Sequence, residues 1–346
     1  MANLAAAGGP IISEKSRPNM TEFIRTPDDN FADLAAFPFQ PNYHRWQDLR
    51  VHFVDEGPKN APVMLLVHGM PTWSYLYRDM IPGLIAAGYR CIAPDHLGFG
   101  RSDKPTDPHW YTIARHTEVL TSVVTGLGLT DVTLVCQDWG GPIGIAQAVT
   151  MPERFSRIVI MNTWLHHQGY EYSDAIRAWN QNWHQGGLFD RERPDVALLP
   201  LLTAGLAGPD VIFPALVDGV VPEFIGRAAE EYRGYAAPFA GLPDAAFNGL
   251  RRFPLSIPFD DYDSGDGAAQ THHYDGLLAW EKPVHFVWGC ADQIFTEAWG
   301  RTWADRLGAS FDPIADGNHF LQDTHGSEIV RSILARMEKD PRRPPA

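Results

Sequence analysis

Residues 134 to 144, LVCQDWGGPIG, are predicted to contain a strand, a tight turn and the start of a helix in direct succession. An apolar run at 132–136 predicts a strand, and a second one at 143–149 predicts a helix directly after it. Asp138 lies between them, with a cysteine and a glycine two positions away on either side. This is the small-x-nucleophile-x-small pattern of a nucleophile elbow, a tight turn that tolerates only small neighbours. Hydrolases usually carry serine at the central position, whereas this chain carries an aspartate.

The rest of the chain places this turn in an α/β fold. Strand-like runs rich in Val, Ile and Leu alternate with longer helical stretches. These runs are 51–57, 63–69, 90–95, 132–138, 157–162 and 284–289, with a weaker one at 310–316. Continuous apolar strands separated by helices indicate a mostly parallel sheet that is covered on both faces. We therefore predict an α/β-hydrolase fold, in which helices flank the sheet.

A long insertion interrupts this rhythm before the strand at 284–289. It is rich in Trp, Tyr, Phe, Pro and Gly, and it far exceeds the roughly dozen residues that one parallel connection needs. We predict a helical cap over the carboxyl ends of the strands, where ligands of open α/β sheets bind. The expected boundaries are a tail at 1–20, a core at 21–163 and 277–340, and a cap at 164–276.

Composition and charge limit the kinds of partner that this chain is expected to bind. The chain has 346 residues, 45% of them hydrophobic, and a net charge of -14. Such an acidic balance argues against nucleic acid or an anionic membrane as a partner. Neither a secretory signal nor a run near the roughly 18 apolar residues of a membrane span is visible. We expect a cytoplasmic monomer without a cofactor, and no Cys/His cluster predicts a metal site.

Three further features have the order expected of a hydrolase site. In this fold the nucleophile is followed by an acid and then by a histidine. Asp292 lies in a turn after the strand 284–289, and His319 lies in a glycine-containing turn after the last strand. The backbone N–H groups of Met70, after the His-Gly pair, and of Trp139 would form an oxyanion hole. Taken alone, Asp138 could instead cap a helix, and Asp292 could simply stabilise its turn.

An aspartate at the elbow suits displacement at a saturated carbon. A carboxylate is already ionised at neutral pH and attacks without a base, forming an alkyl ester on the enzyme. His319, oriented by Asp292, would then activate a water that hydrolyses the ester. A departing epoxide oxygen needs an acid, whereas a halide needs only N–H donors in a dry pocket. The indole of Trp139, next to the nucleophile, is such a donor; its alternative role is that of a core tryptophan.

The chain resembles the haloalkane dehalogenases of the α/β-hydrolase superfamily from about residue 20 onward. The motifs that carry the resemblance are FIRTPDDNFADLAAFPFQPNY, HGMPTWSYLYR, APDHLGFGRSDKP, VCQDWGG and YAAPF…RRFP. The resemblance implies that Asp138 is the nucleophile, Asp292 the acid, His319 the base and Trp139 a halide donor. It implies hydrolysis of haloalkanes to a primary alcohol and halide, with a small halogenated aliphatic substrate and water as partners.

The second halide donor is less closely defined. One branch of the family uses an asparagine after the His-Gly pair, where this chain has Met70. The other branch uses a cap tryptophan, for which Trp164, Trp179 and Trp183 are available. The spacing from Asn162 resembles that branch for Trp179, which we choose, with Trp183 one helical turn on as the runner-up. The resemblance also places Phe253 and Pro254 in the substrate pocket.

Two rival functions remain. An epoxide hydrolase would use the same triad and a cap tyrosine as acid, for which the candidates are Tyr170, Tyr172, Tyr232 and Tyr235. A non-catalytic α/β-hydrolase used as a binding module is the second rival, although such proteins usually lack a triad member.

Overall fold

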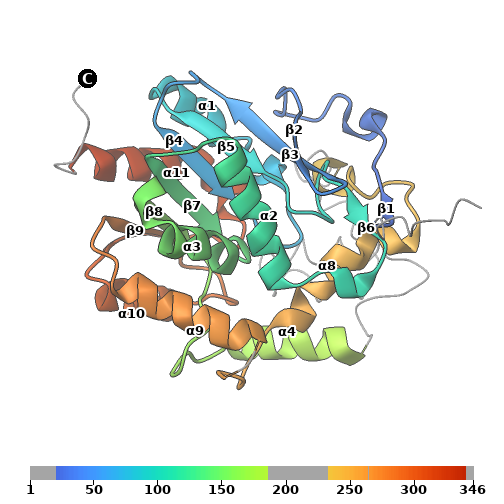
Figure 1. Cartoon of the computed structure of the whole chain (residues 1–346). Coiled ribbons are helices and arrows are strands. Elements are labelled where there is room, and N and C mark those ends of the chain that lie inside the picture. Colours follow the sequence, from blue (N-terminus) through green and yellow to red (C-terminus); the bar gives the residue numbers. More distant parts are fainter. Residues whose placement is uncertain (1–20, 186–232, 264, 340–346) are drawn as a thin grey trace, which may run out of the picture.

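The computed structural model describes residues 21–185, 233–263 and 265–339. The tail predicted at 1–20, the middle of the predicted cap at 186–232 and the end of the core at 340 lie outside the described residues. Within those ranges, an eight-stranded sheet forms the centre (Figure 1), in the order β10-β9-β8-β7-β4-β5-β3-β2. Its strands are β2 (Asn42–Trp46), β3 (Leu49–Glu56), β4 (Val63–Val67), β5 (Arg90–Pro94), β7 (Val132–Gln137), β8 (Phe155–Met161), β9 (Val284–Gly289) and β10 (Ser310–Ile314).

The sheet is mostly parallel, which confirms the predicted fold class. Only the pairs β2–β3 and β3–β5 are antiparallel, while β5, β4, β7, β8, β9 and β10 run parallel to one another. All seven predicted strands are present. The sequence did not reveal β2, because this polar edge strand alternates half-buried and exposed residues. A small pair, β1 (Phe23–Ile24) with β6 (Lys104–Pro105), was also missed.

Helices cover both faces of the sheet. In the view of Figure 1, α2 and α3 lie in front of it, and α11 passes behind, where it contacts α1. β4 and β7 are buried along their whole length, as expected for central strands between two helical layers. The helices outside the predicted cap are α1 (Ile81–Ala86), α2 (Ile113–Gly126), α3 (Gly140–Thr150), α10 (Glu297–Arg306) and α11 (Leu321–Glu338), with short helices η1 (Asp28–Phe31), η2 (Ser74–Tyr77), η3 (Pro108–Trp110) and η4 (Pro152–Arg154).

The inserted segment contributes helices that stand at one end of the sheet. They are α4 (Asp174–Gln185), η6 (Asp244–Phe247), α8 (Asn248–Arg252), η7 (Pro254–Ser256) and α9 (Gly265–Leu278). Figure 1 places α4 and α8 on the same side of the sheet, and both contact η7. The last of these helices, α9, returns to the core and packs on α3.

Buried hydrogen bonds attach the inserted segment to the core. The indole of Trp73 donates to the Gly234 carbonyl at 3.0 Å. The Tyr235 hydroxyl donates to both carboxylate oxygens of Asp323 at 2.8 Å, and Arg78 donates to the same group at 2.5 Å. Because buried polar groups are costly unless they are paired, these contacts define how residues 233–240 sit on the core.

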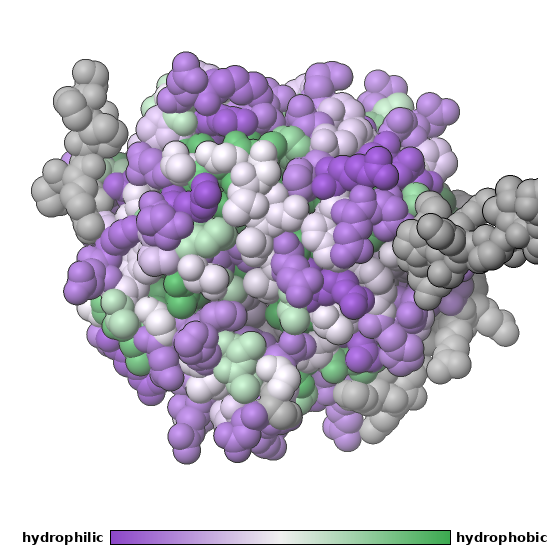
Figure 2. All heavy atoms as spheres, in the orientation of Figure 1, coloured by the Kyte–Doolittle hydropathy of each residue, from purple (hydrophilic) through white to green (hydrophobic). Residues whose placement is uncertain are grey.

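The surface in Figure 2 is largely hydrophilic, and its apolar areas are small and scattered. The large hydrophobic side chains that are exposed among the described residues are Tyr43, Leu255 and Leu278. Within residues 21–185, 233–263 and 265–339, no helix has the length and apolar character needed to cross a membrane.

Candidate active site

The backbone at Asp138 has the strained geometry expected of an elbow. Its φ is 51°, in the left-handed region that L-residues rarely occupy. The Asp138 N–H donates to the Asn162 carbonyl at 3.0 Å, and the Asp138 carbonyl accepts from the Thr163 hydroxyl at 2.5 Å. Space is tight as well, because a Cβ on Gly69 would lie 2.1 Å from Asp138 Oδ1. Several contacts from neighbouring loops therefore hold the strained residue in place.

The Asp138 side chain does not cap the following helix. The N-cap residue of α3 is Trp139, and no side-chain hydrogen bond caps this end. Instead, Asp138 Oδ1 accepts from the backbone N–H of Met70 at 2.7 Å. Trp139 follows at the start of α3, where backbone N–H groups lack partners inside the helix. The carboxylate thus lies beside the two residues whose N–H groups were predicted to bind an oxyanion.

His319 and Asp292 meet beside Asp138. His319 Nδ1 lies 2.8 Å from Asp292 Oδ2, and His319 Nε2 lies 3.6 Å from Asp138 Oδ2. Since a carboxylate only accepts, His319 Nδ1 carries a proton and Nε2 faces the elbow. Asp292 is oriented in turn, because its Oδ1 accepts from the Ile294 N–H at 2.8 Å. The three residues predicted from separate parts of the chain therefore lie together, with His319 hydrogen-bonded to Asp292 and in ion-pair distance of Asp138.

The charge state of His319 depends on both carboxylates. Burial alone would lower its pKa, but Asp292 and Asp138 outweigh burial and raise the pKa of His319 to about 10. With Asp138 ionised, His319 is therefore an imidazolium at neutral pH. Loss of the Asp138 charge would remove part of this effect and lower the pKa of His319.

The sequence did not reveal the part that Asn162 plays. This residue follows β8, and its Nδ2 donates to Asp292 Oδ2 at 2.9 Å and to the Gly289 carbonyl at 3.0 Å. Its Oδ1 accepts from the Gly289 N–H at 2.7 Å. Asn162 therefore connects the end of β8 to the end of β9 and to the acid Asp292. The available signal was a polar residue directly after a buried strand, at the same sheet edge as the triad.

Aromatic residues surround Trp139. The Phe253 ring stacks on it, with centroids 5.0 Å apart and planes at 23°, and the Trp164 ring meets it edge-on at 4.5 Å. Phe253 and Pro254 are both buried. The Pro254 carbonyl accepts from Asn180 Nδ2 at 2.7 Å, which attaches α4 to this wall. Trp179 and Trp183 belong to α4, but their side chains lie outside the described residues.

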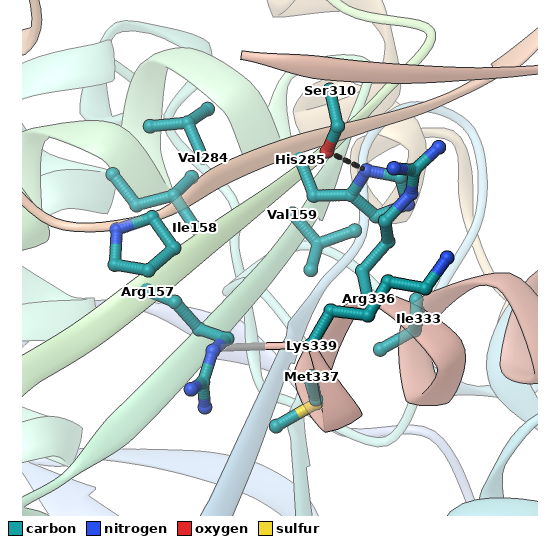
Figure 3. A pocket seen from close by; sticks show the side chains of 11 residues that line it. Arg157, Ile158, Val159, Val284, His285, Ser310, Ile333, Arg336, Met337 and Lys339 are labelled. Carbon is teal, nitrogen blue, oxygen red and sulfur yellow. Dashed lines mark hydrogen bonds between the residues drawn. The ribbon is translucent and has the colours of Figure 1, made fainter. Parts of the chain in front are cut away.

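A separate groove of about 260 Å³ lies at the opposite ends of the strands. Figure 3 shows it between the beginnings of β8, β9 and β10 and the end of α11. Among its polar groups, His285 is hydrogen-bonded to Ser310 at 2.7 Å, and Arg336 is paired with Asp312. The three predicted triad residues follow the carboxyl ends of their strands, so this groove is not part of the candidate active site.

Known proteins similar to this chain share its fold class, and several of them belong to one enzyme family. A family model described as alpha/beta hydrolase fold matches residues 62–326, a range that includes Asp138, Asp292 and His319. The haloalkane dehalogenase of Psychrobacter cryohalolentis is 35% identical and covers 93% of this chain and 100% of its own. That of Mycobacterium marinum is 36% identical and covers 91% and 99%. The tetrameric haloalkane dehalogenase DpaA from Paraglaciecola agarilytica NO2 has a TM-score of 0.77 at 30% identity and covers 91% and 98%. The chain belongs to the haloalkane dehalogenases.

Proposed function

We propose that this enzyme hydrolyses haloalkanes to a primary alcohol and halide through a covalent ester on Asp138. The observation that carries the proposal is a carboxylate at a strained elbow, 3.6 Å from a histidine that is itself held by a second carboxylate. Serine, which needs a base to remove its proton, is absent from the attacking position. The small substrate, water and halide are the partners this chemistry requires.

In the first step, an Asp138 oxygen attacks the carbon that bears the halogen. The new C–O bond forms as the C–X bond breaks, and the electron pair leaves with the halide. The indole of Trp139 would stabilise this anion, since an N–H donor on an apolar ring suits a large anion in a dry pocket. Phe253, stacked on Trp139, and Pro254 would line the pocket around the departing halide.

In the second step, His319 Nε2 takes a proton from water, whose oxygen attacks Asp138 Cγ. The N–H groups of Met70 and Trp139 stabilise the negative oxygen that develops. The alcohol then leaves with a proton from His319, and Asp138, left as a carboxylic acid, releases its proton to solvent to regenerate the carboxylate. Ester formation neutralises Asp138, and this lowers the pKa of His319 from the value of about 10 that both carboxylates produce. The imidazolium can then release its Nε2 proton to solvent, so that the neutral histidine required as a base is present in the intermediate.

The tyrosines of the inserted segment favour halide over epoxide. The Tyr172 hydroxyl is hydrogen-bonded to His166 Nδ1 at 2.7 Å, and the Tyr235 hydroxyl donates to Asp323. Tyr170 is buried, with its ring against Trp299 and Tyr172. Tyr232 lies outside the described residues. Two of the four candidate acids are therefore engaged in other hydrogen bonds, which disfavours the epoxide hydrolase. The binding module is disfavoured for a different reason, because all three predicted triad residues are present.

A substrate comparison tests the proposed function. Incubation with 1,2-dibromoethane should release bromide with turnover, while styrene oxide should give no diol. Ion chromatography and gas chromatography measure the two products. Diol formation without bromide release would favour the epoxide hydrolase, and neither product would favour the binding module. A panel of chloro-, bromo- and iodoalkanes of increasing length would then define the substrate range.

We assign the second halide donor to Trp179. Asn180, the next residue of α4, is hydrogen-bonded to Pro254, which follows the Phe253 ring stacked on Trp139. This contact brings α4, which carries both Trp179 and Trp183, to the wall of the halide site, and the spacing from Asn162 favours Trp179. Trp183, one turn further along α4, remains the alternative.

Trp179→Phe should weaken bromide binding by about tenfold to a hundredfold, because a hydrogen bond to a charged group contributes about 1.5–3 kcal/mol. Trp183→Phe is the matched control and should change the Kd less than threefold. Quenching of tryptophan fluorescence by bromide measures both, with each variant compared to its own unquenched signal. A larger loss in the Trp183 variant would exchange the two assignments.

The domain boundaries and assembly are proposed on similar grounds. Residues 21–163 and 277–340 would form the core and 164–276 the cap, a division supported by the buried contacts that fix 233–240 on the core.

DpaA is a tetramer, whereas we predict a monomer here. Sedimentation velocity distinguishes the two.

A further inference from the structure

The residue directly before the nucleophile contacts the base. Gln137 ends β7 and has no exposed surface. Its Nε2 donates to the His319 carbonyl at 3.1 Å and lies 3.3 Å from His319 Nε2. The motif made this residue conspicuous in the sequence, but the proposed mechanism gives it no role.

The orientation of the Gln137 amide follows from its contacts. Rotating the amide by half a turn would place Oε1 against the His319 carbonyl, so that two acceptors would face each other. In the orientation observed, Nε2 is the donor, and Gln137 Oε1 is buried without a hydrogen-bond partner among the described residues. The side chain therefore leaves one of its own polar atoms unsatisfied while it keeps an N–H near His319.

An amide N–H beside His319 Nε2 favours one protonation state of the ring. His319 Nδ1 keeps its proton for Asp292, so Nε2 has a lone pair when the ring is neutral and an N–H when it is charged. The Gln137 N–H is attracted to the Nε2 lone pair of the neutral ring and repelled by the Nε2–H of the charged ring. Asp138 Oδ2, 3.6 Å from the same nitrogen, has the reverse preference while it is ionised.

We propose that Gln137 is a positioning residue that stabilises the unprotonated Nε2 of His319 once Asp138 has become an ester. This inference rests on the proposed function. Two titratable groups act on His319, namely Asp292 from the turn after β9 and Asp138 from the elbow, while Phe295 and Phe320 cover the ring elsewhere. When alkylation removes the Asp138 charge, the amide is the neighbour that remains at Nε2. Gln137 therefore assists hydrolysis of the ester rather than its formation.

Gln137→Met tests this role, because methionine has a similar length but no N–H. Rapid mixing with 1-bromobutane, followed by acid quench and intact mass, measures formation and decay of the butyl-enzyme between about pH 6 and 10. Ester formation should change less than threefold. The pH at which ester decay reaches half its maximal rate should rise by about 1 unit. Below that pH, decay should be about tenfold slower than in the wild type, as a one-unit rise in the pKa of His319 requires.

The chain offers a matched control in Gln147. This glutamine is also buried, but its amide is fully hydrogen-bonded to α2 and α3, remote from His319. Gln147→Met should leave the pH midpoint of ester decay unchanged. Gln137→Glu, which puts a negative acceptor near Nε2, should move the midpoint further upward than Gln137→Met. Gln137→Asn, which withdraws the amide from Nε2, should move it in the same direction and carries the test if the other variants do not fold.

The outcomes separate this inference from the function on which it rests. If the wild-type enzyme forms no butyl-enzyme, the proposed function is wrong. If the wild type forms and hydrolyses the ester but the Gln137 variants keep its pH midpoint, only the role of Gln137 is wrong. Equal slowing of ester formation and ester decay would indicate a purely structural contribution.

Discussion

Asp138→Ala should reduce halide release by at least about 10⁴-fold, because the reaction loses the atom that forms the covalent bond. Neither water nor a neighbouring group can replace it, since the carboxylate is held at the elbow by φ of 51° and by the Met70 N–H. With 1-bromobutane, intact mass should detect no butyl adduct on the variant. Ion chromatography of bromide measures the loss of turnover.

Two controls separate this loss of chemistry from a loss of structure. Bromide should still quench the fluorescence of Asp138→Ala, because the proposed halide donors are unchanged and a nearby negative charge has been removed. Asp103→Ala also removes a buried carboxylate, which is paired with Arg25 far along the chain from the elbow. It should lower the stability to urea but keep turnover. A butyl adduct on Asp138→Ala would assign the nucleophile to another residue.

The central part of this fold could be predicted because its strands are buried on both faces. β4 reads as an unbroken apolar run and β7 as a mainly apolar one, and the helices between such strands make a parallel sheet the expected arrangement. β2 escaped prediction for the opposite reason. It is a polar edge strand with one neighbour, so its sequence NYHRW carries little burial signal.

The convergence of the candidate site residues could be predicted where chain order and turn chemistry restrict their positions. Asp138, Asp292 and His319 each follow a predicted strand, and parallel strands bring their carboxyl ends to one edge of the sheet. Asn162 also follows a strand, but an amide after a strand is common, and its link to Asp292 depends on the distance between two loops. The contact between Gln137 and His319 is likewise tertiary. Residue types at strand ends can thus be predicted, whereas the pairing of their side chains cannot.

His319→Ala should separate the two steps of the reaction. Ester formation needs only the Asp138 carboxylate and the halide donors, so the variant should still release about one equivalent of bromide per enzyme. Ester hydrolysis loses its general base and should slow by about 10² to 10⁴-fold. Intact mass should therefore show a stable butyl-enzyme, and peptide mapping should place the butyl group on Asp138.

The matched control is His285→Ala. His285 is also a buried histidine, bonded to Ser310 and Ser332, but it lies in the groove at the opposite ends of the strands. Its loss should leave repeated turnover intact, so a stall in both variants would indicate general damage to the fold. Continued turnover in His319→Ala alone would reject His319 as the base. A stall without an adduct would reject the ester itself. A stall with the adduct on Asp138 would support both roles, because only an enzyme that has completed the first step can accumulate the ester.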